Sequence, residues 1–196
     1  LIGPMSGVYS ASFCPNFRTW LASAAPHDLR TWQDVGNVGY ELDIDGLSLA
    51  GDVEHVYDPW HYPEDWDVEG FSPEGPKIHR HAGWFHMLTA VGGTAGPPTG
   101  HMVIAARSRS IHGPWQQHPG NPLVRTRSDA EAWWSRGHAS LVEGPDGSWW
   151  SLYHGYEAHF WTLGRQCLLD PVEWTADGWP RMTGGDLSRP IHSPSS

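Results

Sequence analysis

The sequence predicts an all-β fold assembled from repeated strand units, and three observations indicate this class. No stretch of a dozen residues carries an amphipathic helical stripe without a glycine or proline break. Short apolar segments alternate instead with turn residues. Two strand patterns recur along the chain, as they do in the blades of a propeller.

The first recurring pattern is a hairpin. Strand candidates 77–79 and 84–88 flank a His-Ala-Gly turn. The same design returns at 140–143 and 149–154 around an Asp-Gly turn at 144–147, a dipeptide that favours tight hairpin connections. We therefore expect two hairpins of similar construction.

The second recurring pattern joins residues 24–33 to residues 105–116. Each segment reads as a small-residue strand, a polar turn and then Trp-Gln. Trp84 and Trp149, which open the second strands of the two hairpins, lie 65 positions apart, a spacing that suits a four-stranded blade with loops. About three such units fit in 196 residues, whereas propellers close with about four to eight blades. The sequence therefore predicts an incomplete propeller.

Composition excludes two classes of partner. The formal net charge is -10, which opposes a nucleic-acid groove because such grooves need clustered Lys and Arg. No apolar run approaches the roughly 18 residues that span a bilayer. With 39% apolar and 17% charged residues the chain fits one globular domain, and we expect neither nucleic acid nor membrane as a partner.

The 13 tryptophans favour a carbohydrate-binding function, because an indole face stacks on the C–H face of a sugar. The competing interpretation is that most of them fill the interior of the sheets. Segment 57–67 is acidic and aromatic, and it fits either a stacking platform or a solvated connection between blades.

The cysteines and the chain ends leave the compartment open. Cys14 and Cys167 form neither a CxxC pair nor a disulfide framework. The segment that begins at Leu1 shows no signal-peptide pattern and resembles a start in mid-protein, so the localisation stays unknown. Residues 186–196 are rich in Ser and Pro, as linkers are, and we expect an accessory domain to follow them.

Glu74 is the first candidate for catalysis. It lies in a Pro-Glu-Gly-Pro run directly before a strand candidate, where the backbone is restricted and a ligand can approach closely. Taken alone, the motif fits a solvated turn carboxylate better than a catalytic one.

A set of motifs in order along the chain resembles glycoside hydrolase family 43. The matching segments are 74–90, 92–94, 100–101, 106–110, 136–147, 153–157, 163–166 and 171–180. The resemblance implies a five-bladed β-propeller with an inverting glycosidase site, in a family dominated by β-xylosidases and α-L-arabinofuranosidases. It also implies that the partner is an oligosaccharide derived from xylan or arabinan.

The same resemblance implies roles for three residues. Glu74 corresponds to the general acid, whose pKa should be raised by burial or by a nearby carboxylate. Arg165 corresponds to an arginine that contacts substrate, and a planar guanidinium can donate to several sugar hydroxyls. His138 corresponds to a histidine that coordinates calcium directly or through water. A surface arginine and a satisfied core histidine are the alternatives for the last two.

The resemblance leaves two carboxylates unassigned. Family members carry a catalytic base and a second Asp that tunes the acid, and residues 1–39 match the family poorly. Asp58 has the Asp-Pro context of the second one, but it stands only 16 positions before Glu74. We divide the chain into 1–39, propeller blades at 40–185, and the linker 186–196. The rival function is a carbohydrate-binding propeller that has lost its base, and we expect the chain alone to be inactive.

Three histidines, at positions 79, 81 and 86, crowd the first hairpin and raise the question of zinc. A turn separates the first two from the third, and none has a Cys or carboxylate partner at ligand spacing. The sequence therefore disfavours zinc at this hairpin.

Overall fold

The computed structural model describes residues 37–39, 54–62, 71–94 and 96–182 of the chain. These residues form antiparallel strands, and the single helical element among them is a short 3-10 turn, η1 (Trp161–Leu163). The all-β prediction is confirmed. In the described part of the chain, no helix has the length and apolarity that a membrane crossing requires.

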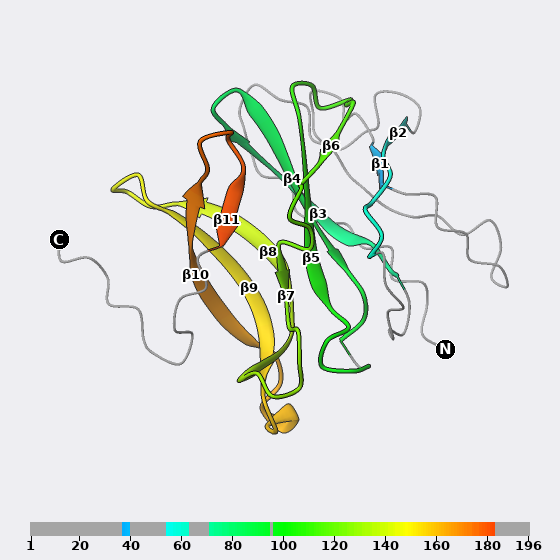
Figure 1. The fold of residues 1–196 in the computed structure, drawn as a ribbon, viewed down its shortest axis with the longest axis vertical. Coiled ribbons are helices and arrows are strands. Elements are labelled where there is room, and N and C mark those ends of the chain that lie inside the picture. Colours follow the sequence, from blue (N-terminus) through cyan, green and yellow to red (C-terminus); the bar gives the residue numbers. More distant parts are fainter. Residues whose placement is uncertain (1–36, 40–53, 63–70, 95, 183–196) are drawn as a thin grey trace, which may run out of the picture.

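The first sheet is a meander of consecutive strands. It runs in the order β3 (Glu74–His81), β4 (Trp84–Val91), β5 (Met102–Ser108) and β6 (Gln116–Gln117), with each strand hydrogen-bonded to the next (Figure 1). A further short strand, β7 (Val124–Arg125), pairs with the start of β5.

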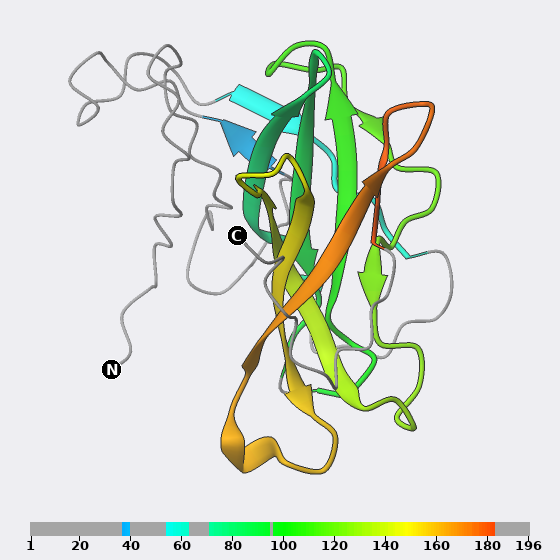
Figure 2. The same ribbon diagram turned by 90° about the vertical axis from the view of Figure 1, so that its left-hand side faces the viewer.

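The second sheet repeats this arrangement. It runs in the order β8 (Trp133–Glu143), β9 (Trp149–Glu157), β10 (Gln166–Trp174) and β11 (Pro180–Met182). Figure 2 shows the long, twisted strands of this sheet beside those of the first. Two four-stranded units with the same strand order are two blades of a propeller.

Both predicted hairpins are confirmed. The β3–β4 turn is Ala82-Gly83, where both residues adopt positive φ, and the β8–β9 connection contains Gly147 at φ 80°. Trp84 opens β4 and Trp149 opens β9, so each takes the same place in its sheet, as the 65-residue spacing predicts.

The second recurring pattern is described in one of its two copies. Residues 105–116 contain the end of β5 and the start of β6, which pair with each other. The other copy, 24–33, lies outside the described residues, as do the predicted linker 186–196 and most of segment 1–39. From that last segment β1 (Asn37–Gly39) pairs with β2 (Glu54–Tyr57) in a separate two-stranded sheet.

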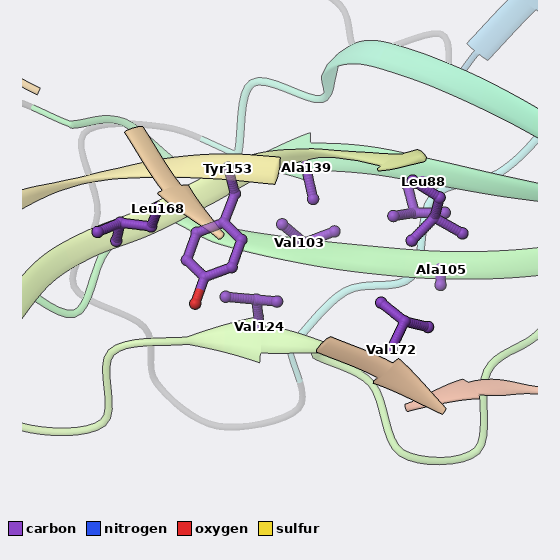
Figure 3. Packing of buried hydrophobic residues seen from close by; sticks show 9 residues of the cluster. Leu88, Val103, Ala105, Val124, Ala139, Tyr153, Leu168 and Val172 are labelled. Atoms are coloured by element: carbon purple, nitrogen blue, oxygen red, sulfur yellow. The ribbon is translucent and has the colours of Figure 1, made fainter. Parts of the chain in front are cut away.

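A shared hydrophobic core joins the two blades. Leu88 and Val103 of the first sheet lie in one buried cluster with Tyr153 and Leu168 of the second (Figure 3). In the second sheet, β9 and β10 alternate buried and less buried positions, which is the pattern of a sheet with one face on a core. In the first sheet, β5 is buried at every position. The cluster therefore packs a face of one blade against a face of the other.

A smaller cluster covers the end of the first blade. Val91, Met102 and Ile104 are fully buried there, and Trp60 and Tyr62 pack against them. These two aromatic residues of the predicted platform segment therefore contribute to packing. Residues 63–67 of that segment lie outside the described residues.

Several tryptophans serve the interior, as the competing interpretation of the composition held. The guanidinium of Arg107 lies 4.3 Å from the ring of Trp84 and 3.9 Å from the ring of Trp179, between blades. His81 stacks on Trp174 with ring centroids 3.7 Å apart and planes 9° apart. Such contacts bury large apolar faces and hold the blades together.

The three hairpin histidines contact the second blade in different ways. His79 accepts the backbone N–H of Leu141 on β8 through Nε2 at 3.1 Å. His81 stacks on Trp174, and the buried His86 lies at an angle to the same indole. Among the described residues they do not form a group of metal ligands. His79 instead ties β3 to β8.

Candidate functional site

The candidate site forms where the edge strands of the two blades meet. Glu74 is the first residue of β3 and His138 lies on β8, and each of these two strands is an edge strand of its sheet. Oε1 of Glu74 lies 3.6 Å from Nδ1 of His138, which is within ion-pair distance but just beyond hydrogen-bond range. The Glu74 side chain is 44% exposed and that of His138 is 22% exposed, so the carboxylate faces solvent while the imidazole backs it.

Gly75 is required for this contact. Its φ is +53°, a left-handed conformation that disfavours other residues, and a Cβ at this position would lie 2.3 Å from Nε2 of His138. His138 itself adopts φ 62° within a strand that changes register beside it. The close approach of the two edges therefore depends on the missing side chain at position 75.

His101 lies beneath these residues, just before β5. It is 1% exposed, and its Nδ1 lies 2.6 Å from the carbonyl oxygen of Gly92. Because a carbonyl only accepts, Nδ1 carries the proton and Nε2 keeps its lone pair. This Nε2 is buried and has no hydrogen-bond partner among the described residues.

His154 on β9 completes the imidazole group. Its ring lies parallel to that of His101, with centroids 5.3 Å apart and planes 6° apart, and 5.8 Å from the ring of His138. Arg165, just after η1, places a guanidinium nitrogen 3.4 Å from Nε2 of His154. Nδ1 of His154 is buried without a partner in the described part of the chain.

The structure thus brings the three residues predicted from sequence into one neighbourhood and adds two others. The cluster consists of Glu74, His101, His138, His154 and Arg165. The two additions lie inside motifs that the sequence displays, but their contacts cross between blades, and no local pattern reveals such contacts.

One sequence signal could have found the additional residues. Every member of the cluster stands next to a glycine, and these glycines are Gly75, Gly100, Gly137, Gly155 and Gly164. The chain has 23 glycines, so adjacency alone is a weak signal. Adjacency at the end of a strand is more specific, because glycine there allows two backbones or a backbone and a ring to approach closely.

The cluster lowers the pKa of Glu74, opposite to the direction expected for a general acid. The contact with His138 is the main cause, burial opposes it, and weaker electrostatic effects of His138, His101 and Arg165 add to the lowering of the pKa. Imidazoles and a guanidinium favour the carboxylate form. The expectation of a raised pKa is therefore wrong for the described neighbours of Glu74.

The buried imidazoles favour the neutral form. Burial, with a smaller effect of neighbouring His101 and Arg165, lowers the pKa of His154 to about 3. Burial also lowers the pKa of His101, although its hydrogen bond to Gly92 opposes this. Both side chains can therefore act as lone-pair donors near neutral pH.

The donors around His138 are nitrogens rather than oxygens. His101, His138 and His154 each place a ring nitrogen within 4.8 Å of the other two, and Glu74 supplies the neighbouring carboxylate. Calcium takes about six to eight oxygen ligands, which this donor set does not provide. Calcium at His138 stays a prediction, and the described residues fit it poorly.

Chemically, the cluster offers a half-exposed carboxylate beside an exposed guanidinium. The carboxylate can exchange a proton with a bound molecule, and the guanidinium can donate to hydroxyl or carboxylate oxygens. The less exposed imidazole of His138 contacts the carboxylate from behind.

A family model described as Glycosyl hydrolases family 43 matches residues 16–180. The match includes every residue of the cluster, and it extends into segment 1–39, which sequence inspection alone places outside the matching region.

Two curated relatives show what the chain is similar to. The non-reducing end alpha-L-arabinofuranosidase BoGH43B of Bacteroides ovatus is 36% identical over 117 residues, which are 58% of this chain and 22% of the relative. The xylan 1,3-beta-xylosidase of a Vibrio species is 30% identical over 166 residues, which are 76% of this chain and 29% of the relative. The chain spans less than a third of the length of these relatives.

Solved structures agree with the fold. The crystal structure of a xylan beta-1,4-xylosidase from Bacillus halodurans superposes with a TM-score of 0.70 at 30% identity, covering 84% of this chain and 30% of that one. The Bacteroides ovatus xyloglucan GH43B structure superposes with a TM-score of 0.66 at 27% identity, covering 85% and 30%. These neighbours are five-bladed propellers, so the predicted fold class, part of a five-bladed propeller, is confirmed.

Proposed function

The chain belongs to glycosyl hydrolases family 43, and from this membership we propose that the protein cleaves terminal xylosyl or arabinofuranosyl linkages of oligosaccharides derived from xylan or arabinan. The observation that carries the proposal is the position of Glu74 at the start of β3. Its half-exposed side chain lies against His138 and near Arg165. The similar relatives, named as a xylosidase and an arabinofuranosidase, support the substrate class.

In the proposed reaction Glu74 protonates the leaving glycosidic oxygen. A separate carboxylate deprotonates a water on the opposite face of the sugar, and the anomeric configuration inverts. The described neighbours of Glu74 favour its ionised form. We therefore assign the raising of its pKa to a second carboxylate outside the described residues, because a like charge favours the protonated acid.

Arg165 and His138 have supporting roles in this proposal. The exposed guanidinium of Arg165 binds the hydroxyls of the terminal sugar, since it presents several donors in one plane. His138 positions Glu74, because its imidazole contacts the carboxylate from the less exposed side.

A second candidate is a carbohydrate-binding propeller without turnover. The lowered pKa of Glu74 favours it, because a carboxylate that stays ionised accepts hydrogen bonds from sugar hydroxyls and donates no proton. This candidate requires that no second carboxylate acts on Glu74.

The test uses the full-length gene product with aryl β-xylosides and aryl α-L-arabinofuranosides, followed by proton NMR. We expect hydrolysis with inversion, and we expect Glu74→Gln to lower kcat/KM by about 10² to 10⁴. Glu143→Gln, at the exposed far end of β8, is the matched control and should keep full activity. Retention of configuration would refute the mechanism, and binding of xylo-oligosaccharides without hydrolysis would establish the second candidate.

A further inference from the structure

We propose that His101, His138 and His154 form a binding site for a late first-row divalent cation such as Zn²⁺, and that the bound ion blocks the neighbouring glycosidase site. The binding half of the proposal depends only on these side chains. The inhibitory half rests on the proposed function.

The type of donor selects the type of ion. All three ligands are imidazoles, with ring nitrogens within 4.8 Å of one another. Imidazole suits Zn²⁺, Ni²⁺ and Cu²⁺, whereas calcium requires a shell of oxygens. The site therefore discriminates against calcium.

Two of the imidazoles already have the outer contacts that histidine ligands commonly have. Such a ligand donates its other ring N–H to a backbone carbonyl or to a carboxylate, which fixes the tautomer and the ring orientation. In His101, Nδ1 donates to the carbonyl of Gly92 at 2.6 Å. In His138, Nδ1 faces the carboxylate of Glu74 at 3.6 Å. Both arrangements leave Nε2 as the ligand atom.

The site also contains polar atoms that lack partners. Nε2 of His101 and Nδ1 of His154 are buried, and neither has a hydrogen-bond partner among the described residues. A buried polar atom without a partner is costly to the folded state. An ion bound to both nitrogens removes that cost.

Binding requires a small contraction of the cluster. Two nitrogens about 2.1 Å from a tetrahedral zinc lie about 3.4 Å apart. In this structure the ligand nitrogens of the three histidines lie up to 4.8 Å apart. The farthest pair of nitrogens must therefore approach by up to about 1.4 Å when the ion binds. A fourth position stays available for water or for Glu74.

A bound ion and the guanidinium of Arg165 cannot both keep their positions beside His154. The guanidinium lies 3.4 Å from Nε2 of His154, and when Nδ1 binds a metal this Nε2 carries the proton. The guanidinium then faces both another donor and a cation, so it must move away. The ion also attracts the carboxylate of Glu74 and holds it ionised. Substrate binding and proton donation are lost together.

Titration calorimetry of the metal-free, full-length protein tests the binding. We expect Zn²⁺ to bind in one-to-one stoichiometry and at least about 100-fold more tightly than Ca²⁺. His101→Asn and His154→Ala should weaken Zn²⁺ at least tenfold, with metal-free melting curves confirming that each variant folds. His112→Ala, on the exposed β5–β6 loop, is the matched control and should bind as the wild type does.

Arg165→Ala provides an independent test, because it changes no buried side chain. Removal of the neighbouring positive charge should tighten Zn²⁺ binding by about three- to tenfold. Arg181→Ala, exposed on β11, should leave the Zn²⁺ affinity unchanged. Equal affinities for Zn²⁺ and Ca²⁺, or Zn²⁺ binding that survives both histidine variants, would overturn the proposal.

The two halves fail separately. Zn²⁺ binding in a protein that hydrolyses no glycoside would refute the proposed function and leave the metal site standing. Hydrolysis that persists at saturating Zn²⁺ would refute the inhibitory half. An active enzyme without Zn²⁺ binding would refute the metal site alone.

Discussion

At the scale of single residues, glycines decide where the imidazoles of the site can lie. A Cβ on Gly137 would lie 2.0 Å from Cδ2 and 2.4 Å from Nε2 of His101, closer than real contacts allow. No positive φ is involved at this position, so the requirement is one of space. His101 keeps its place because the neighbouring strand carries no side chain there.

We therefore expect Gly137→Ala to displace His101 and to lower kcat/KM by about 10²-fold, because a misplacement of about 1 Å near a reacting group has an effect of that size. Gly147→Ala is the control. It adds a methyl group in open space at φ +80°, in the turn between β8 and β9. It should lower the melting temperature while kcat/KM stays unchanged, and equal activity of both variants would contradict the steric argument.

The sequence predicts the individual site residues better than their electrostatics. Glu74, His138 and Arg165 each lie in a recognisable motif, and the structure places them together. The expected rise in the pKa of Glu74 is not found, because its sign depends on which groups from other strands surround the carboxylate. Two of those groups, His138 and His101, stand 64 and 27 positions away in the sequence.

At the scale of elements, the blades are held together by apolar side chains that cross between sheets. Leu88 on β4 is 1% exposed and belongs to the cluster that both sheets share. We expect Leu88→Ala to reduce the free energy of unfolding by about 2 to 5 kcal/mol, because it leaves a cavity at the joint.

Leu152→Ala is the matched control for this prediction. Leu152 also lies in a central strand, β9, but its side chain is 43% exposed. Its truncation should cost less than about 1 kcal/mol in a denaturant titration. Similar losses for both variants would show that the shared cluster does not hold the blades together.

Hairpins follow from sequence more readily than sheets do. The turns at Ala82-Gly83 and around Gly147 depend on local residues, and both hairpins form as predicted. The pairing of β7 with β5 was not predicted, because a strand of two residues leaves no periodic pattern. The contact between β3 and β8 joins strands from different blades, and nothing local to either strand specifies it.

At the scale of the whole molecule, buried histidines make the stability depend on pH. Burial, with smaller effects of neighbouring His81 and Arg107, lowers the pKa of His86 to about 4. The folded state therefore favours neutral His86. Its contribution is fully present above the unfolded pKa of about 6.5 and is lost as the pH falls towards about 4.

We expect the free energy of unfolding to decrease steadily from about pH 6.5 to pH 4. His86→Leu should reduce that decrease by an amount on the order of 2 kcal/mol, since it removes a buried group that must otherwise be protonated. Denaturant titrations at several pH values measure the slope, with the exposed His112→Leu as control. A slope that His86→Leu leaves unchanged would show that this histidine is not the source.

The central claim is that Glu74 donates a proton to the leaving group of a glycoside, and the dependence of its loss on that leaving group tests the claim directly. A dinitrophenolate departs with little help, whereas the sugar oxygen of xylobiose needs a proton. The measurement is kcat/KM of the full-length protein and of Glu74→Gln on dinitrophenyl xyloside and on xylobiose. We expect a loss of about 10²- to 10⁴-fold on xylobiose and of less than about tenfold on the dinitrophenyl substrate. Equal losses on both substrates would contradict it, because they would assign Glu74 a role other than proton donation.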